Sequence, residues 1–311
     1  MILLTGGLGF IGPHTARALL DLGEDVVATR FRTARVPDFL SAELGTRLFV
    51  ERADVADPDA LAAIGRRYPI DGVVHLASPR LSDQELGRDV RTNVSGLLTV
   101  VRAAADWGVR RLSLASSIAV YAGVAQRPWR EDQPLPMEVD AALPVTAFKK
   151  AEEILGGHFA ARLGVPVVHL RIAGIYGPLY HSMSNPPSRL VHAAVRGGPV
   201  EGPPIRAGDR TDMCYVKDCA RGVALLQTAP SLSYGTFNVG SGTAPAYQDF
   251  ADAIRARIPS ADLGLDPAPS TTHGGPLDLT RIREAVGYAP EYDVARAVDD
   301  YIAWLRDGHE R

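Results

Sequence analysis

MILLTGGLGFIG, residues 1 to 12, decides the fold that this sequence predicts. An apolar strand runs directly into a turn with Gly6, Gly9 and Gly12, and PHTARALLDLG then continues as an amphipathic helix. The first glycine permits the tight turn, the second lets backbone approach a pyrophosphate, and the third lets the helix pack on the strand. The helix amino terminus offers N–H groups and a partial positive charge to the same ligand. The stretch therefore predicts a dinucleotide site between a strand and a helix.

The same alternation continues over the first half of the chain. Short apolar runs rich in Val, Ile and Leu are typical of buried parallel strands, and the amphipathic stretches between them close near a glycine, as helices often do. Repeated units of this kind predict an α/β fold with a Rossmann-type doubly wound parallel sheet. The apolar runs are MILL, DVVAT, RLFVE, GVVHLA, RLSLASS and VPVVHLR, and the later helical stretches are PDALAAIGRRY, VRTNVSGLLTVVRAAADWG and TAFKKAEEILGGHFAARLG.

The pattern changes after about Tyr176. Proline and glycine become dense, in GPLYHSMSNPP, RGGPVEGPPIRAGD and DPAPSTTHGGP, and few strands are predicted. These segments alternate with packable ones such as CARGVALLQTA, which favours ordered loops around a ligand cleft over linkers. We expect a Rossmann domain over residues 1–175 and a smaller, mostly C-terminal α/β substrate lobe over 176–311, with some segments returning to the Rossmann domain.

Composition favours a small-molecule partner. The 311 residues carry 33 basic and 36 acidic side chains, and no run of five like charges points to a nucleic acid or a membrane surface. Cys214 and Cys219 lack the spacing of a metal or redox site, so we expect ordinary thiols in a reducing compartment and no metal. The amino terminus does not resemble a signal peptide, and no apolar run approaches the ~20 residues of a membrane helix. A cytoplasmic location is expected.

The sequence resembles the extended short-chain dehydrogenase/reductases, the NAD(P)-dependent sugar epimerases and dehydratases, over nearly its whole length. Their T-G-x-x-G-x-x-G signature matches Thr5 to Gly12. Further similar segments follow in order: ADVAD, HLAS, NVSG, ASSIAVY, LRIAGIYGP, YVKDCARG, FNVGSG and EYDVARAVDDYIAWL. The resemblance implies an oxidoreductase or isomerase, and a homodimer packed through the helices that contain residues 93–107 and 148–162.

The resemblance also implies which residues hold the cofactor. Asp54 matches the acidic turn that contacts adenine, HLAS the segment beside the dinucleotide, and Asn93 the start of the long central helix. The expected cofactor-binding residues are Gly6, Gly9, Phe10, Ile11, Gly12, Arg30, Asp54, Val55, Leu76, Ala77, Ser78, Asn93, Lys149 and Ile175.

The end of the second strand bears on the choice of cofactor. A site that selects NAD usually has Asp or Glu about 20 residues after the glycines, whereas an arginine there accommodates the extra phosphate of NADP. Here VVAT ends in Arg30, and Arg32 and Arg35 follow. A guanidinium can grip that phosphate through charge-assisted hydrogen bonds, whereas a carboxylate would repel it. We therefore expect NADP, with NAD as the alternative.

The catalytic helix lacks the expected acid. In the family a tyrosine moves the proton that accompanies hydride transfer, and a lysine four residues later on the same helix face lowers its pKa. In LPVTAFKKAEEIL the family pattern K-x-A-x-E-x-L assigns the lysine to Lys149, which places Val145 at the tyrosine position. If the register slips by one, Lys150 pairs with Thr146, whose alcohol is a far weaker acid than a phenol. Neither register restores the usual chemistry.

Ser117, four residues before Tyr121 in ASSIAVY, matches the family's catalytic Ser or Thr. The proton donor is open. One hypothesis brings another acid from the loop after the last predicted strand: Tyr176, Tyr180 or His181, the histidine being well suited because its reference pKa of ~6.5 lies near neutral pH. A second is a non-redox enzyme on the same fold. A third is a non-catalytic NAD(P)-binding sensor or structural protein.

Two further departures concern the substrate. Sugar-nucleotide members commonly have an Asn where this chain has Gly174, and an Arg where it has Thr211, with Arg210 one residue early. The loss of an arginine matters because a guanidinium matches phosphate oxygens in direction as well as charge. A sugar nucleotide and a small hydroxy or carbonyl metabolite both stay open as substrates.

Overall fold

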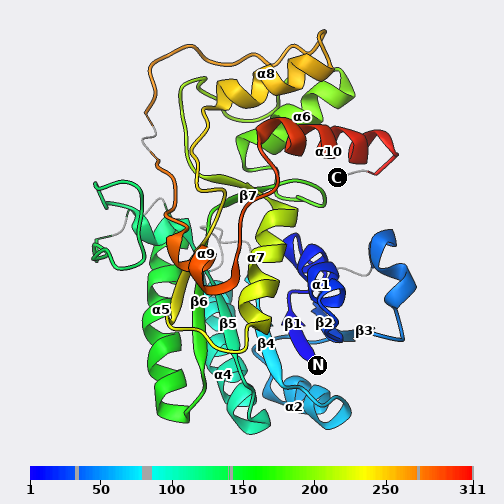
Figure 1. Ribbon diagram of the computed structural model, residues 1–311, viewed down its shortest axis with the longest axis vertical. Helices are drawn as coiled ribbons and strands as arrows, with labels where there is room; N and C mark the ends of the chain where they lie inside the picture. Colours follow the sequence, from blue (N-terminus) through cyan, green and yellow to red (C-terminus); the bar gives the residue numbers. More distant parts are fainter. Residues whose placement is uncertain (32–34, 79–85, 139, 141–142, 272–273, 310–311) are drawn as a thin grey trace.

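A seven-stranded parallel sheet forms one half of the molecule (Figure 1). The computed structural model describes residues 1–31, 35–78, 86–138, 140, 143–271 and 274–309. The strand order is β3-β2-β1-β4-β5-β6-β9, so successive strands are added on opposite sides of the β1–β4 pair. In folds of this kind, ligands bind at the carboxyl ends of the strands beside such a switch point. The predicted Rossmann-type fold is confirmed. The strands are β1 (Ile2–Thr5), β2 (Val26–Arg30), β3 (Leu48–Arg52), β4 (Gly72–His75), β5 (Leu112–Ser117), β6 (Val167–Ile172) and β9 (Thr236–Val239).

Helices cover both faces of this sheet. On one face α1 (Ile11–Asp21) packs beside α7 (Val216–Thr228), and on the other α4 (Gly96–Trp107) packs between α2 (Pro58–Arg67) and α5 (Pro144–Leu163). Each face buries its own apolar core. Shorter elements join them: η1 (Asp38–Glu43), α3 (Leu86–Val90), the π-helical turn η2 (Arg91–Ser95), η3 (Ile118–Tyr121) and α9 (Thr280–Val286).

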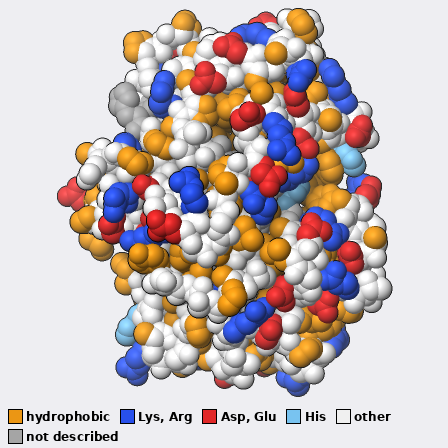
Figure 2. Space-filling model, in the orientation of Figure 1, with side chains coloured by type: hydrophobic (Ala, Val, Ile, Leu, Met, Phe, Trp, Pro, Cys, Tyr) orange, Lys and Arg blue, Asp and Glu red, His pale blue; other side chains and the backbone are white. Residues whose placement is uncertain are grey.

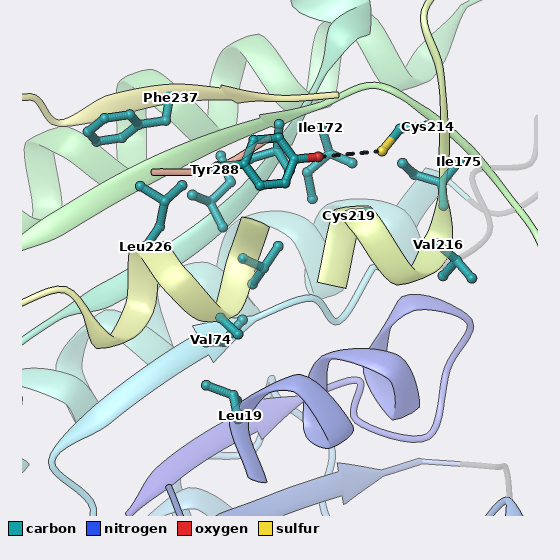
Figure 3. Close-up of a cluster of buried hydrophobic side chains, with 14 of the residues drawn as sticks. Leu19, Val74, Ile172, Ile175, Cys214, Val216, Cys219, Leu226, Phe237 and Tyr288 are labelled. Carbon is teal, nitrogen blue, oxygen red and sulfur yellow. Dashed lines mark hydrogen bonds between the residues drawn. The ribbon is translucent and has the colours of Figure 1, made fainter. Parts of the chain in front are cut away.

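Figure 3 shows the core between the sheet and helices α1 and α7. Cys214 and Cys219 lie in it as free thiols, both fully buried, and Cys214 Sγ lies 3.9 Å from the Tyr288 hydroxyl. Burial raises the pKa of both thiols, which keeps them protonated. They pack as small apolar groups.

A smaller lobe lies above the carboxyl edge of the sheet (Figure 1). Its core is formed by aromatic and aliphatic side chains from three separate parts of the chain, 176–215, 247–263 and 297–302. Beside the loops that the sequence predicts, three amphipathic helices of 11, 11 and 13 residues pack around this core. The lobe contains β7 (Gly174–Tyr176), β8 (Met213–Tyr215), α6 (Pro186–Arg196), α8 (Tyr247–Arg257) and α10 (Val294–Arg306).

Charged side chains of both signs are interspersed over the face seen in Figure 2. In the described ranges of the chain, no helix combines the length and the apolar character that crossing a bilayer requires. Among the same residues, no three His, Cys, Asp or Glu side chains lie close enough together to hold a metal ion.

Candidate active site

The glycine turn is built so that side chains are excluded from it. Gly6 has φ of +68°, and a Cβ there would lie 2.9 Å from the backbone nitrogen of Ala77. A Cβ on Gly12 would lie 2.7 Å from Gly7 Cα, so only glycine lets α1 pack on the turn. At Gly9 the nearest atom to a Cβ would be Gly6 O at 3.1 Å, and its other side is open. The turn therefore presents bare backbone at Gly9, as the sequence predicts.

The first turn of α1 has free donors. Within residues 1–31, no side chain caps the helix that begins at Ile11, and its first turn has no acidic residue. Unsatisfied N–H groups and the helix dipole favour a phosphate at such an end. The bare backbone at Gly9 and this uncapped helix together fit the pyrophosphate of a dinucleotide.

A buried pair that sequence analysis missed supports the turn from below. Thr5 Oγ1 lies 2.7 Å from His75 Nδ1 and accepts a longer hydrogen bond, 3.4 Å, from the Ala77 N–H. The Gly6 N–H donates to Thr29 Oγ1 at 3.2 Å. Burial, with a smaller effect from the Lys149 charge, lowers the pKa of His75 to about 3, so the imidazole is neutral at neutral pH. These contacts join the ends of β1, β2 and β4 beneath the glycines.

Asp54, in the turn after β3, uses both of its carboxylate oxygens in contacts with other protein groups. One oxygen of Asp54 accepts from the Ala56 N–H at 3.0 Å, and the other pairs with Arg91 at 3.1 Å. Val55 beside it is buried against Gly96. Arg91 begins the π-helical turn, in which the Asn93 amide donates to Asp89 O at 2.9 Å.

The segment after β4 also reaches this turn. Leu76 donates to Thr5 O at 3.2 Å, and the Ser78 hydroxyl donates to the side-chain oxygen of Asn93 at 3.4 Å. The structure thus brings the expected residues of HLAS and NVSG together at one edge of the sheet. Arg30 stands at the carboxyl end of β2 on the same edge.

Lys149, and not Lys150, contacts the sheet near the carboxyl end of β5. Its Nζ donates to Ala115 O of β5 at 2.8 Å and to Glu152 Oε2 at 2.6 Å. Lys150 instead points to the segment before α5, where its Nζ donates to Pro136 O and Glu138 O. The geometry therefore agrees with the register that the K-x-A-x-E-x-L pattern indicates.

The residues one turn before each lysine differ in access. Val145 is partly buried, whereas Thr146 is 1% exposed and its hydroxyl has no hydrogen-bond partner among the described residues. Ser117 closes β5, and its Oγ accepts from the Ala119 N–H at 3.1 Å. Ser117 and Lys149 thus lie at the carboxyl end of one strand, with valine in the first turn of the neighbouring helix.

A buried ion pair lies beneath this edge. Arg171 of β6 donates to both oxygens of Glu153 of α5, at 3.0 and 2.8 Å, and to the Tyr121 hydroxyl at 3.0 Å. Ser116 Oγ donates to Glu153 Oε1 at 2.5 Å. Burial alone would raise the pKa of Glu153, but hydrogen bonds from Arg171 and Ser116 and the Arg171 charge lower it overall. The ion pair holds α5 against β6, and the Ser116 hydrogen bond holds it against β5, the strand that carries Ser117.

The three candidate acids differ in position: Tyr176 ends β7, whereas Tyr180 and His181 lie in the loop between β7 and α6. The structure does not bring Tyr176 to the sheet edge: the side chain is 1% exposed and packs against Tyr215 and Phe250, with ring centroids 5.4 and 5.3 Å away. Tyr180 contacts Phe10 of the glycine turn, ring centroids 4.7 Å apart, and His181 beside it is exposed. Of the three, Tyr180 therefore contacts the glycine turn, and His181 follows it in the same loop.

The side chain of Ile175, an expected cofactor-binding residue, is part of the apolar core. Its side chain points into the core in Figure 3, and its carbonyl accepts from the Asn185 amide at 2.7 Å. At Gly174 a Cβ would lie 2.6 Å from Met213 Sδ, so an asparagine could not stand there without displacing the methionine.

Comparison with a family model decides the classification. The model described as the NAD dependent epimerase/dehydratase family matches residues 2–240. The chain belongs to this family. The resemblance carried by the glycine motif and the later segments is thereby confirmed, and an enzyme of the NAD-dependent epimerase/dehydratase class is supported.

Individual relatives of this epimerase/dehydratase family member are similar over almost their full length. A dTDP-glucose 4,6-dehydratase from Streptomyces griseus is 29% identical over 320 residues, which cover 97% of this chain and 93% of the relative. A UDP-glucuronate 4-epimerase from Thermodesulfobacterium geofontis is 29% identical over 327 residues, covering 99% and 97%.

Solved structures of the family share the fold. The UDP-glucose 4-epimerase of Thermotoga maritima, solved with UDP-glucose, superposes with a TM-score of 0.83 at 22% identity and 99% coverage of both chains. MoeE5, solved with UDP-glucuronic acid and NAD, has a TM-score of 0.80 at 26% identity, again with 99% of both chains covered.

Proposed function

We propose that this family member is an NAD(P)-dependent oxidoreductase or epimerase/dehydratase-type enzyme that does not use a phenol at position 145 for proton transfer. The observation that carries the proposal is the placement of Ser117 and Lys149 at the carboxyl end of β5, on the edge where the bare glycine turn and the uncapped α1 favour a dinucleotide. The nicotinamide, when bound, accepts or donates a hydride. The chain must then hold the substrate oxygen and move its proton.

The division of that work follows from the side chains present. The Ser117 hydroxyl holds the substrate oxygen, and Lys149 holds the ribose on the nicotinamide side. Val145 can neither donate nor accept a proton, and Tyr176 is buried in the lobe core. His181, exposed on the loop whose Tyr180 contacts the glycine turn, is the group we assign to proton transfer.

A proton-transfer role for His181 predicts a large loss of turnover in His181→Gln. General acid–base catalysis contributes about 10²–10⁴-fold, so kcat should fall by at least 100-fold while cofactor affinity is kept. The measurements are product formation from a panel of alcohols, carbonyl compounds and sugar nucleotides, followed by chromatography, and the absorbance of the reduced cofactor where turnover consumes it. His158→Gln, an exposed position on α5, and Tyr176→Phe, a buried phenol, serve as controls and should keep their activity.

Val145 also favours the two alternatives without redox chemistry. If no compound in the panel changes the absorbance of the cofactor and Ser117→Ala has no effect on any conversion, the chain is a non-redox enzyme or a non-catalytic NAD(P)-binding sensor or structural protein. Association with another protein that depends on added nucleotide would support the sensor. Product formation without net cofactor consumption would support an epimerase or a non-redox enzyme.

We propose a sugar nucleotide or a small hydroxy or carbonyl metabolite as substrate. The names of the relatives, a dTDP-glucose dehydratase and a UDP-glucuronate epimerase, support the first. Gly174, where Met213 fills the space of a longer side chain, and Thr211 in place of an arginine support the second. The same panel separates the two classes.

We propose NADP as the preferred cofactor on the basis of Arg30. Structural neighbours such as MoeE5 were solved with NAD, so NAD is the alternative. One charge-assisted contact to the extra phosphate contributes on the order of 1.5–3 kcal/mol, so NADP should bind about ten-fold or more tightly than NAD. Arg30→Asp should remove the preference in calorimetric titrations, whereas Arg66→Asp on the exposed side of α2 should keep it. Equal affinities in the unmodified protein would contradict the assignment.

The domain division and the assembly stay proposals. We assign residues 1–175 to dinucleotide binding and 176–311 mainly to the substrate lobe, with α7, β9 and α9 as the segments that return to the sheet.

A homodimer through α4 and α5 is favoured by exposed apolar side chains on α5, Ile154 and Leu163. Light scattering at micromolar concentration should give twice the 33.3 kDa of one chain. The buried free thiols Cys214 and Cys219 favour a reducing, cytoplasmic location.

A further inference from the structure

Lys149 has a carboxylate partner that no family motif predicts. Glu152 Oε2 accepts from Lys149 Nζ at 2.6 Å, and the two side chains are only 15% and 12% exposed. The pair lies beside Ala115 O of β5, the second acceptor of the lysine. An exposed pair at this spacing would contribute little, but this one is held in a fixed position at the sheet edge.

The hydrogen-bonding capacity of the pair is not used up. An ammonium has three donors, and protein groups take two of those of Lys149. Glu152 accepts through Oε2, while its Oε1 has no hydrogen bond from another described residue. One donor of Lys149 and one oxygen of its partner Glu152 therefore have no protein partner among the described residues.

We propose that Glu152 is a binding residue for the ribose on the nicotinamide side of the cofactor, acting together with Lys149. An adjacent N–H donor and carboxylate acceptor complement a vicinal diol, in which each hydroxyl can both accept and donate. The inference rests on the proposed function for the presence of the dinucleotide, and it adds a residue and a ligand group to that site.

The absence of a tyrosine gives the carboxylate a further role. In a site with a tyrosine, the positive charge of the lysine lowers the pKa of the phenol. Here Val145 leaves the ammonium without such a partner, and Glu152 supplies the negative charge instead. The Lys149–Glu152 pair is neutral overall, so the lysine is held in place without an added positive charge next to the nicotinamide.

The acceptor role requires an ionised Glu152. Burial raises the pKa of its carboxyl, Lys149 acts against that rise, and the neighbouring Glu153 adds to it. The charged groups around the pair are Glu153 on α5, Arg171 on β6, which pairs with Glu153, and His75 on β4, which is neutral at neutral pH. Cofactor affinity should therefore fall as the pH decreases through the raised pKa of Glu152, because the protonated carboxyl no longer accepts in the same way.

Calorimetric titration with two ligands tests the proposal. NADP⁺ or NAD⁺ contains the nicotinamide ribose, whereas ADP and adenosine 2′,5′-bisphosphate contain only the adenosine side. Glu152→Gln should weaken dinucleotide binding by about ten-fold or more, lose the acid limb of its pH dependence, and leave the adenosine ligands unchanged. Glu152→Asp, which keeps the charge with a shorter reach, should give an intermediate loss. Glu284→Gln, which removes one exposed charge on α9, is the matched control.

Two results would overturn the proposed role of Glu152. Unchanged dinucleotide affinity in Glu152→Gln overturns the proposal, and so does an equal loss for dinucleotide and adenosine ligands, which would indicate a general structural effect. Thermal unfolding of each variant shows whether the fold is kept. Failure of the proposed redox reaction is distinguishable, because these readouts measure binding and need no turnover. If the unmodified protein bound no dinucleotide at all, both proposals would be rejected together.

Discussion

Gly9→Asp is expected to weaken dinucleotide binding by at least about 100-fold, which corresponds to about 2.7 kcal/mol. A Cβ at this position already lies 3.1 Å from Gly6 O, so the new side chain must extend toward the open side of the turn. There its carboxylate takes the space of the pyrophosphate and repels it, at a helix end where the free N–H groups would otherwise bind the anion.

The control for this prediction is Gly198→Asp. Gly198 follows α6, and a Cβ there meets no atom within 4 Å, so the same charge change is made without steric conflict. Its dinucleotide affinity by calorimetry should equal that of the unmodified protein. Wild-type affinity in Gly9→Asp, with the fold intact by circular dichroism, would remove the dinucleotide site from the glycine turn.

Arg171→Leu is expected to lower the free energy of unfolding by about 3–5 kcal/mol, the loss typical of breaking a buried ion pair by removing one partner. Arg171 is 6% exposed, and its removal leaves the Glu153 carboxylate and the Tyr121 hydroxyl buried with fewer partners. Urea unfolding followed by circular dichroism measures the change. Arg257→Leu, which breaks an exposed pair with Asp299, should leave the free energy of unfolding nearly unchanged.

The pH dependence of the free energy of unfolding is a second test of this prediction. The pKa of Glu153 in the folded protein lies below its ordinary value of 4.5 because Arg171 and Ser116 outweigh burial. A carboxyl with a depressed pKa in the folded state contributes stability above its unfolded pKa and loses it as the pH falls through the folded value. The difference between the unmodified protein and Arg171→Leu should therefore be largest at neutral pH. It should shrink as the pH falls from the raised pKa that burial gives Glu153 without Arg171 to the lowered pKa that Glu153 has in the unmodified protein. A difference that does not change with pH would mean that packing, not charge, dominates.

Most of the sheet could be predicted from local pattern, because six of its strands are apolar runs between amphipathic helices. The seventh, β9 (TFNV), escaped prediction because it lies in the half of the chain where proline and glycine dominate. Its partner β6 lies more than sixty residues earlier, and only tertiary pairing selects it. Long-range pairing of this kind has no signal in a sequence window.

The candidate site was predictable where a motif fixes the backbone, and not where the role of a residue depends on its neighbours in space. The glycine turn follows from its spacing, and the register of Lys149 is what the family pattern K-x-A-x-E-x-L implies. Glu152 was not singled out, because a glutamate in a helix is ordinarily a solvated residue and only the fold places it against Lys149 in a partly buried site. Tyr176 looked available from its loop motif, but the core formed with Tyr215 and Phe250 buries it.

The lobe core is assembled from three stretches, 176–215, 247–263 and 297–302, while α7, β9 and α9 between them pack on the sheet. The smaller lobe is thus formed from non-contiguous parts of the chain. Exchanging it for the lobe of a relative requires three coordinated segment exchanges with the sheet-bound segments left in place, whereas a single crossover between residues 176 and 302 would combine lobe segments from two parents.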